Sequence, residues 1–352
     1  MADRLKSLRV VDPVLTSIAR GYSNAQYIGE SLFPIAITEK EGVVVPLFGK
    51  ESFLLWDTER AIRAASNVMV PDGIGELDVV LREHDLAYPV DYREKSESMF
   101  DAESRAAKRV KDAIDLRREY ACAALAQNPN SFQAGAKKAL SGTARWSGNG
   151  GDPIADVEAG KEVIRGRIGK RPNTMVMGAS VYQSLKFHTK LQAALGSQER
   201  KLVTLEHLKM LFGVDDIQIG EALGGSGAGN KITTDDIWGD NVILAYVAKP
   251  NASRNADYEE PSFGYTLRLK GMPETDKYDG GSGGKVQNVR HTDIYKPVIV
   301  GADAGYDAAM KDLVSIGKGL MALPVAPATV PMPTPAASGM VVRTRPRTFG
   351  ES

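Results

Sequence analysis

The sequence predicts an α+β protein in which strand-rich and helix-rich stretches follow one another along the chain. Residues 43–90 hold short runs of Val, Leu, Phe and Tyr between polar residues, a pattern typical of strands. Residues 92–127 carry apolar side chains at three- and four-residue spacings without Gly or Pro, which predicts one long helix. From residue 151 onward, short helical and strand patterns alternate, which predicts a second domain.

The first 91 residues divide into an arm and a long hairpin. Residues 1–42 carry scattered turn residues and too few apolar ones to close a core, so we expect an arm that lies on other parts of the protein. In residues 43–91, four strand-like runs flank a turn-rich stretch of about twenty residues, and the runs are 43–48, 52–56, 77–81 and 85–90. A hairpin loop of this length is normally functional or mobile.

The predicted helix over 92–127 should be about 50 Å long. Its Ala-rich apolar stripe predicts close packing against a sheet or another helix. Its cations are nearly matched by its acids: Arg105, Lys108, Arg109, Lys111, Arg117 and Arg118 against Asp101, Glu103, Asp112, Asp115 and Glu119. This balance favours a solvated face with ion pairs four residues apart over a DNA-binding face.

The region from residue 151 combines helices, strands and a glycine-rich loop. The pattern predicts helices at 154–168, 181–195 (broken) and 204–212, strands at 174–177, 217–219 and 242–247, and a loop at 220–230. Another strand is expected at 262–270, a flexible break at 280–284 and an extended segment at 286–300. The Pro-rich stretch 321–352 cannot bury enough apolar surface to fold alone.

Composition excludes several classes of protein. The chain has 44 basic and 44 acidic residues in 352, so electrostatic capture of nucleic acid is not its main task. A single cysteine, Cys122, permits no intrachain disulfide and fits a reducing cytoplasm. No apolar signal segment starts the chain, and five prolines interrupt the uncharged stretch 319–342, so we expect neither secretion nor a membrane span.

The sequence predicts no catalytic, cofactor-binding or metal-binding residues. The glycine run 224–231 ends in Asn-Lys-Ile and leads toward a strand, whereas a phosphate loop needs Gly-Lys-Ser/Thr before a helix. The acid pairs at 215–216 and 235–236 occur where acids commonly end loops, and Cys122 stands where a small apolar residue is expected. The four histidines have no metal-ligand spacing: His84, His188, His207 and His291.

The order of the parts resembles the major capsid proteins of tailed bacteriophages, which have the Hong Kong 97-type fold. The most specific stretches are DDIWGDNVILAYV (235–247) and PSFGYTLRL (261–269), which look like the central sheet of the family's axial domain. The arm segments 12–24 and 28–34 and the segment 293–306, which ends the peripheral domain, are also similar to the family. The resemblance covers most of residues 11–313.

The resemblance implies a shell protein that assembles with itself into pentamers and hexamers around double-stranded DNA. Its implied parts are an N-terminal arm (1–42), an extended loop (43–91), a peripheral domain with a spine helix (92–150), an axial domain (151–270), a return to the peripheral domain (271–320) and a tail (321–352). Implied partners are separate scaffolding, portal and decoration proteins, with weak nonspecific contact to the packaged DNA. The shell would form in the host cytoplasm and become part of the virion.

Four residues are predicted to lie at contacts between subunits: Trp56, Arg60, Arg63 and Arg82. Arginines on an extended loop suit ion pairs with carboxylates of a neighbour. Some family members instead lock the shell with an isopeptide bond from a loop lysine, but residues 51–94 contain no lysine, which predicts a noncovalent shell. Two alternatives stay open: the shell of an encapsulin-like compartment that holds cargo enzymes, and a soluble cytoplasmic enzyme.

Overall fold

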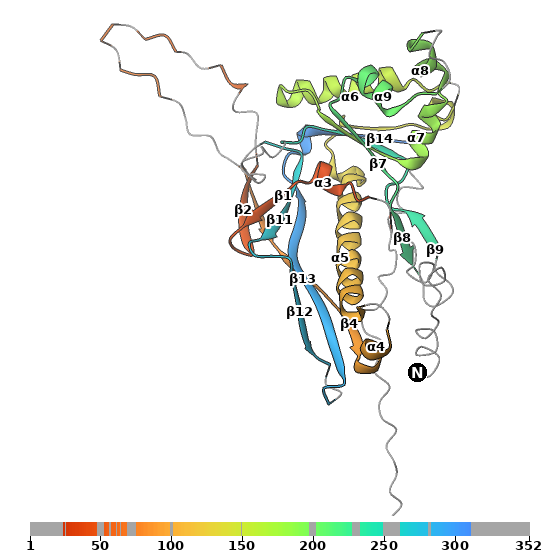
Figure 1. The fold of residues 1–352 in the computed structure, drawn as a ribbon. Coiled ribbons are helices and arrows are strands. Elements are labelled where there is room, and N and C mark those ends of the chain that lie inside the picture. Colours follow the sequence, from red (N-terminus) through yellow and green to blue (C-terminus); the bar gives the residue numbers. More distant parts are fainter. Residues whose placement is uncertain are drawn as a thin grey trace, which may run out of the picture.

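The structure, a computed structural model, describes residues 24, 26–47, 53–55, 58–60, 62–63, 65–68, 75–98, 101–148, 150–196, 202–226, 233–248, 261–280 and 283–310. Figure 1 shows two regions, one above the other, each built on a five-stranded sheet. We call them the spine sheet, which lies beside the long helix α5, and the axial sheet, which lies among four shorter helices. A loop projects sideways from the body.

The spine sheet is organised around β13 (Val286–Ile299), a strand of 14 residues. Strand β4 (Arg82–Asp91) pairs with it along one side in antiparallel register. On the other side, β12 (Glu274–Asp279) pairs with the first half of β13 and β11 (Gly264–Leu269) with the second half. Strand β1 (Ile35–Thr38) runs parallel to β11, so the arm contributes the last strand of this sheet.

The expectation that 261–269 lies in one sheet with 242–247 is wrong. Strand β11 pairs with β1 and β13, whereas β10 (Asn241–Ala245) belongs to the axial sheet. The two runs have similar β-prone patterns, and such a pattern does not say which strand will be the partner. The short connection from β12 to β13 favours antiparallel pairing of those two strands, and β11 lies next to β12 along the chain and pairs with the same strand. Tyr265 and Leu267 are buried in a core separate from that of the axial sheet.

The predicted hairpin is present but shorter than expected. Strands β2 (Gly42–Leu47) and β3 (Gly75–Val80) pair in antiparallel register. The predicted run 52–56 is no strand in its described residues 53–55, and the run 85–90 belongs to β4 of the spine sheet. The hydrogen bond from Leu81 N to Glu41 O is the last one between the two sides of the hairpin. The ten residues that follow, β4, instead form backbone hydrogen bonds with β13, which is why the predicted run 85–90 is not part of the hairpin.

The single helix predicted over 92–127 is two helices, α4 (Tyr92–Glu97) and α5 (Ala102–Ala126). The break contains no Gly or Pro, but Asp101 caps α5 by accepting a hydrogen bond from Glu103 N. Ser and Asp side chains compete with the helix for backbone donors in this way, so they favour a new start. Helix α5 packs on β13 and β4 through Ala102, Ala106, Val110 and Ile114.

The axial sheet has the strand order β5-β14-β10-β6-β7. Its strands are β5 (Lys137–Ala139), β6 (Thr174–Gly178), β7 (Asp216–Gly220), β10 and β14 (Gly305–Ala309). Every residue of β6, β10 and β14 is buried, which explains their continuous apolar runs. The sheet takes strands from both sides of the 151–270 range, so its ends come from distant parts of the sequence.

The helices around the axial sheet agree with the sequence. They are α6 (Pro153–Ile168), α7 (Ala179–Lys186), α8 (Thr189–Ala194) and α9 (Leu205–Phe212). Thr204 caps α9, and Gly213 ends it with a φ of 57°, a left-handed conformation that favours glycine. The predicted loop 220–230 is wrong in part, because β8 (Leu223–Ser226) pairs with β9 (Thr233–Asp236), while 227–230 lie outside the described residues.

The largest core joins the axial domain to the arm and to the end of α5. Arm residues Leu32 and Phe33, in and just after the short helix α3 (Gly29–Leu32), are fully buried there. They pack in one cluster with Ala123 and Ala126 of α5 and with Phe263. The arm is thus a structural part of the body from residue 26 onward. Among the helices that the structure describes, none has the length and apolar character needed to cross a membrane.

Candidate assembly surfaces

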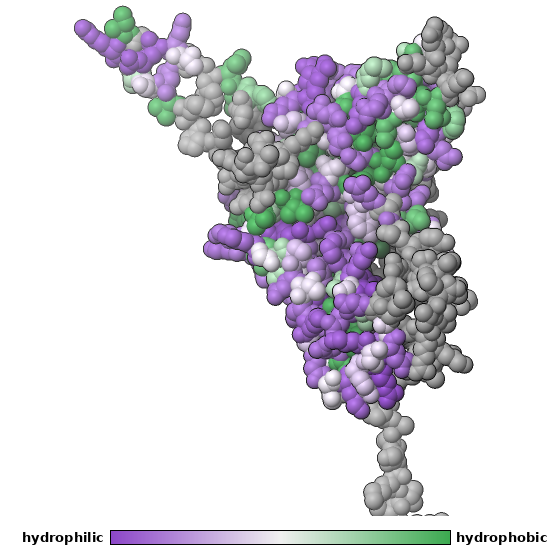
Figure 2. All heavy atoms as spheres, viewed as in Figure 1, coloured by the Kyte–Doolittle hydropathy of each residue, from purple (hydrophilic) through white to green (hydrophobic). Residues whose placement is uncertain are grey.

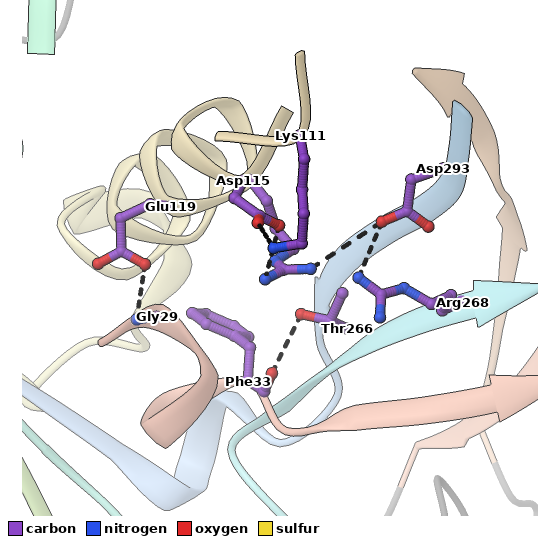
Figure 3. Close-up of polar contacts among 9 residues, drawn as sticks. Gly29, Phe33, Lys111, Asp115, Glu119, Thr266, Arg268 and Asp293 are labelled. Carbon is purple, nitrogen blue, oxygen red and sulfur yellow. Dashed lines mark hydrogen bonds and ion pairs between the residues drawn. The ribbon is translucent and has the colours of Figure 1, made fainter. Parts of the chain in front are cut away.

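A buried carboxylate joins the arm, α5 and the axial domain. Glu119, only 3% exposed, accepts hydrogen bonds from the backbone N of Ile28 (2.9 Å) and of Gly29 (2.8 Å) and from Trp238 Nε1 (2.7 Å). Figure 3 shows Glu119 pointing from α5 toward Gly29. A Cβ at position 29 would lie 2.7 Å from Glu119 Oε2, so glycine is required for this close approach.

The end of α5 is fixed to the axial domain by a second buried side chain. Gln127 Nε2 donates to Ile237 O at 2.9 Å, and its Oε1 accepts from Gly239 N at 2.9 Å. Glu119 and Gln127 therefore hold both sides of Trp238, which is 2% exposed. Because buried polar groups are costly when unpaired, these contacts define one geometry between α5 and the axial sheet.

A chain of ion pairs holds the middle of α5 on the spine sheet. Lys111 Nζ lies 2.6 Å from Asp115, which lies 3.2 Å from Arg118. Arg118 lies 3.9 Å from the buried Asp293 of β13, and Asp293 also accepts a hydrogen bond from Arg268 at 2.8 Å. Figure 3 shows this chain running from the helix to the sheet.

The sequence-based view of α5 as a face of ion pairs holds only for part of the helix. Within α5, the described pairs are Lys111–Asp115, four residues apart, and Arg118–Asp115, three apart. Four exposed cations make no ion pair with any described residue: Arg105, Lys108, Arg109 and Arg117. The surface of α5 therefore retains a modest positive charge, interrupted by Asp101 and Asp112.

Of the four predicted contact residues, the structure places two on the projecting loop. Arg60 and Arg63 are exposed there, while Trp56 lies outside the described residues. Arg82 is exposed at the start of β4, so it belongs to the spine sheet and is not brought together with the loop arginines. It lies near His84, whose ring stacks on Tyr295 at 4.3 Å; burial, Arg117 and Arg82 lower the pKa of His84.

The loop carries apolar side chains that its own chain leaves in water. Leu55 is 101% exposed, Ile62 94% and Val68 85%, against 56% for Phe53. Phe53 lies near Gly169 at the end of α6, with its ring atoms 3.0 to 3.1 Å from where a Cβ of residue 169 would be. We call the described residues of 53–68 the outer loop, and Figure 2 shows it as a projection with both hydrophobic and hydrophilic residues. The sequence pattern placed Phe53 and Leu55 in a predicted strand and did not single out Ile62 and Val68, because their exposure depends on where the loop ends.

The residues considered for chemistry are dispersed. Across the described ranges, no group of three His, Cys, Asp or Glu residues could hold a metal ion. Asp216 accepts hydrogen bonds from Gln218, and Asp235 and Asp236 are exposed on β9. Cys122 is buried in α5, and burial raises the pKa of its thiol to about 12, which makes it a poor nucleophile at neutral pH.

The arrangement of a spine helix on a long sheet, an axial sheet with its helices and a projecting loop defines the class of the protein. It is the Hong Kong 97-like capsid fold, and the solved capsid of cyanophage P-SCSP1u has the same fold with a TM-score of 0.51 at 11% identity, covering 83% of this chain and 90% of the other. A phage-related protein from Bordetella bronchiseptica RB50 is more similar, with a TM-score of 0.67 at 32% identity, covering 86% and 97%.

Sequence comparisons give the family. The model described as phage major capsid protein E matches residues 33–274. The major capsid protein of Burkholderia phage BcepMu is 50% identical over 303 residues, which cover 86% of this chain and 97% of that protein. The chain belongs to the phage major capsid protein E family and is therefore a structural protein of the virion shell.

Proposed function

We propose that copies of this chain assemble into pentamers and hexamers that close an icosahedral shell around double-stranded DNA, and that the projecting loop is a principal contact between neighbours. The observation that supports the loop's role is the almost complete exposure of Leu55, Ile62 and Val68. Each such side chain would gain about 1.5–3 kcal/mol from full burial. A two-stranded hairpin is marginal alone, so a loop of this kind is useful only when a neighbour covers it.

Removing the outer loop should abolish assembly without unfolding the chain. Replacing residues 54–69 by a four-residue Gly-Ser linker leaves Phe53 and the β2–β3 pairing in place. We expect the thermal midpoint to change little, because the removed residues that the structure describes are all exposed. We expect size-exclusion chromatography to show no megadalton particles. Normal particles from this variant would contradict the proposed role of the loop.

A milder variant controls for the change in loop length. Leu55→Ser, Ile62→Ser and Val68→Ser together keep the length and the arginines but remove the apolar surface. This triple variant should also fail to form stable particles. If it assembles while the shortened loop does not, the loop acts through its length or its charge and not through apolar burial.

We propose a noncovalent shell. The loop arginines cannot lose a proton at accessible pH, so they cannot attack a neighbouring amide as a desolvated lysine can. Boiled mature particles should give one band near 37.9 kDa on a denaturing gel. A ladder of larger bands that resists boiling and reductant would refute this. The candidate donors would then be Lys95, in α4, and Lys50, which lies outside the described residues.

We propose a purely structural role without catalysis, with separate scaffolding, portal and decoration proteins as partners. The near-neutral sequence supports weak, nonspecific contact with the packaged DNA. An encapsulin-like compartment would hold enzymes in place of DNA, and electron microscopy of purified particles distinguishes the two contents. The phage relatives support the DNA-filled alternative. A small cytoplasmic enzyme would elute as a small oligomer.

A further inference from the structure

One face of the β2–β3 hairpin is left uncovered and has a distinct chemistry. The inner face, with Val45 and Val79, is buried in a core, while the outer face carries the exposed residues Val44 (52%) and Val80 (63%). In the register of the two strands, Val44 lies opposite Asp78 and Pro46 opposite Glu76. Apolar residues thus lie beside carboxylates on one surface, which we call the hairpin outer face.

The hairpin outer face is acidic and has no cation of its own. Strands β2 and β3 contain no Lys or Arg, and neither Glu76 nor Asp78 forms an ion pair with a described residue. Figure 2 shows hydrophobic residues gathered near the hairpin on the same side of the molecule as the projecting loop. Such a surface fits a partner that combines apolar side chains with positive charge.

One part of the outer loop has the complementary chemistry, although the loop also carries the exposed carboxylate Glu59. Ile62 and Val68 are nearly fully exposed, and Arg63 is exposed between them. Arg63 also has a φ of 68°, the left-handed region that a residue with a Cβ adopts only at a cost. Contacts with a neighbouring copy would offset this cost.

We propose that the outer loop of one chain docks on the hairpin outer face of a second copy, with Arg63 beside Asp78 and Glu76 and with Ile62 against Val44 and Val80. This inference rests on the proposed self-assembly. Its own hairpin is not the seat, because the described loop residues lie well away from it in Figure 1. With 27 residues between β2 and β3, each half of the loop can span at most about 45 Å, enough to reach a neighbour.

Such a contact is heterologous, because the loop of one copy meets a different surface of the next. Repeated by rotation, it closes a ring, as pentamers and hexamers require.

The axial domain offers a competing apolar docking surface, where Phe187 (62%) and Met210 (67%) are exposed. Lys209, before Met210, already has Glu206 at 3.8 Å. Lys186, before Phe187, would repel Arg63, so the acidic hairpin is favoured.

Disulfide trapping tests the seat directly. Ile62→Cys combined with Val80→Cys should give crosslinked chains when assembled particles are oxidised, seen as a ladder on a nonreducing gel. Cys122 does not interfere, because it is buried. The matched control, Ile62→Cys with Met210→Cys, should give about tenfold less product. Crosslinking in the control pair instead, or in neither pair, would overturn the proposal.

Charge reversal tests the ionic part. Arg63→Glu and Asp78→Arg should each lower the particle yield about tenfold or more, and the two together should restore it. Lys108→Glu combined with Asp78→Arg is the control and should not restore the yield. If both single variants assemble normally, or if the double variant is no better than the singles, the ion pair does not exist. If the unsubstituted chain forms no particles, the proposed self-assembly is wrong. That result differs from particles that form without the proposed contact between the outer loop and the hairpin outer face.

Discussion

Replacing Glu119 by alanine should lower the free energy of unfolding by about 4 kcal/mol, since three buried donors would lose their acceptor at about 1–3 kcal/mol each. These donors are the backbone N of Ile28 and Gly29 and Nε1 of Trp238. Most natural domains are stable by only 5–15 kcal/mol, so a large part of the total would be lost. Urea denaturation followed by tryptophan fluorescence measures the change.

Two variants separate the hydrogen bonds from other effects at this site. Glu119→Gln keeps the volume but turns one acceptor oxygen into a donor, so we expect a loss of about 2 kcal/mol. Glu162→Ala removes an exposed partner of Arg165 and should cost much less stability, because solvent screens exposed ion pairs. If Glu119→Ala lowered the free energy of unfolding no more than Glu162→Ala, the hydrogen bonds of Glu119 would not be what holds the arm on the body.

Asp307 should make the stability of the axial sheet depend on pH. It is 1% exposed in β14, and burial raises its pKa to about 7, although the hydrogen bonds from Asn241 and the charge of Lys137 act in the opposite direction. The folded chain therefore keeps a proton that the unfolded chain loses near pH 3.8. The contribution of this proton to the free energy of unfolding is largest below about pH 4. It decreases as the pH rises to about 7, by about 4 kcal/mol in total.

Asp307→Asn should remove this pH dependence. Asparagine is neutral throughout and its oxygen can still accept the hydrogen bond from Asn241 Nδ2, which lies 3.1 Å from Asp307 Oδ1. At pH 8 the variant should be more stable than the unsubstituted chain by about 1–3 kcal/mol. Thermal unfolding between pH 4 and pH 8 tests this, with the exposed Asp112→Asn as control. A variant that is less stable at pH 8 would show that the carboxylate is stabilised where it lies.

Local signals in the sequence predicted local structure well. Thr204 and Gly213 mark the ends of α9, and the apolar run at 174–177 is the buried strand β6, because caps and periodicity act between residues close in sequence. Partners distant in sequence were not readable in the same way. The placement of β11 depends on β1 and β13, whose paired residues are at least 27 positions away along the chain.

The most important buried polar residue was also missed by sequence reasoning. Glu119 looked like one more acid on a charged helix, balancing nearby cations. Its burial depends on the arm and on Trp238, which lie 91 and 119 residues away. The one available signal is its position next to the apolar stretch around Cys122, where a solvated acid is unexpected.

The position of β14 in the axial sheet has a consequence for folding during synthesis on the ribosome. This strand, the last that the structure describes, is inserted between β5 and β10. Similarly, β13 has β4 on one side and both β11 and β12 on the other. The spine sheet cannot be completed before residue 299 has been synthesised, nor the axial sheet before residue 309, and such distant pairing makes folding slow. A nascent chain therefore lacks both finished sheets for most of its synthesis, so we expect assembly to begin only when synthesis is nearly complete.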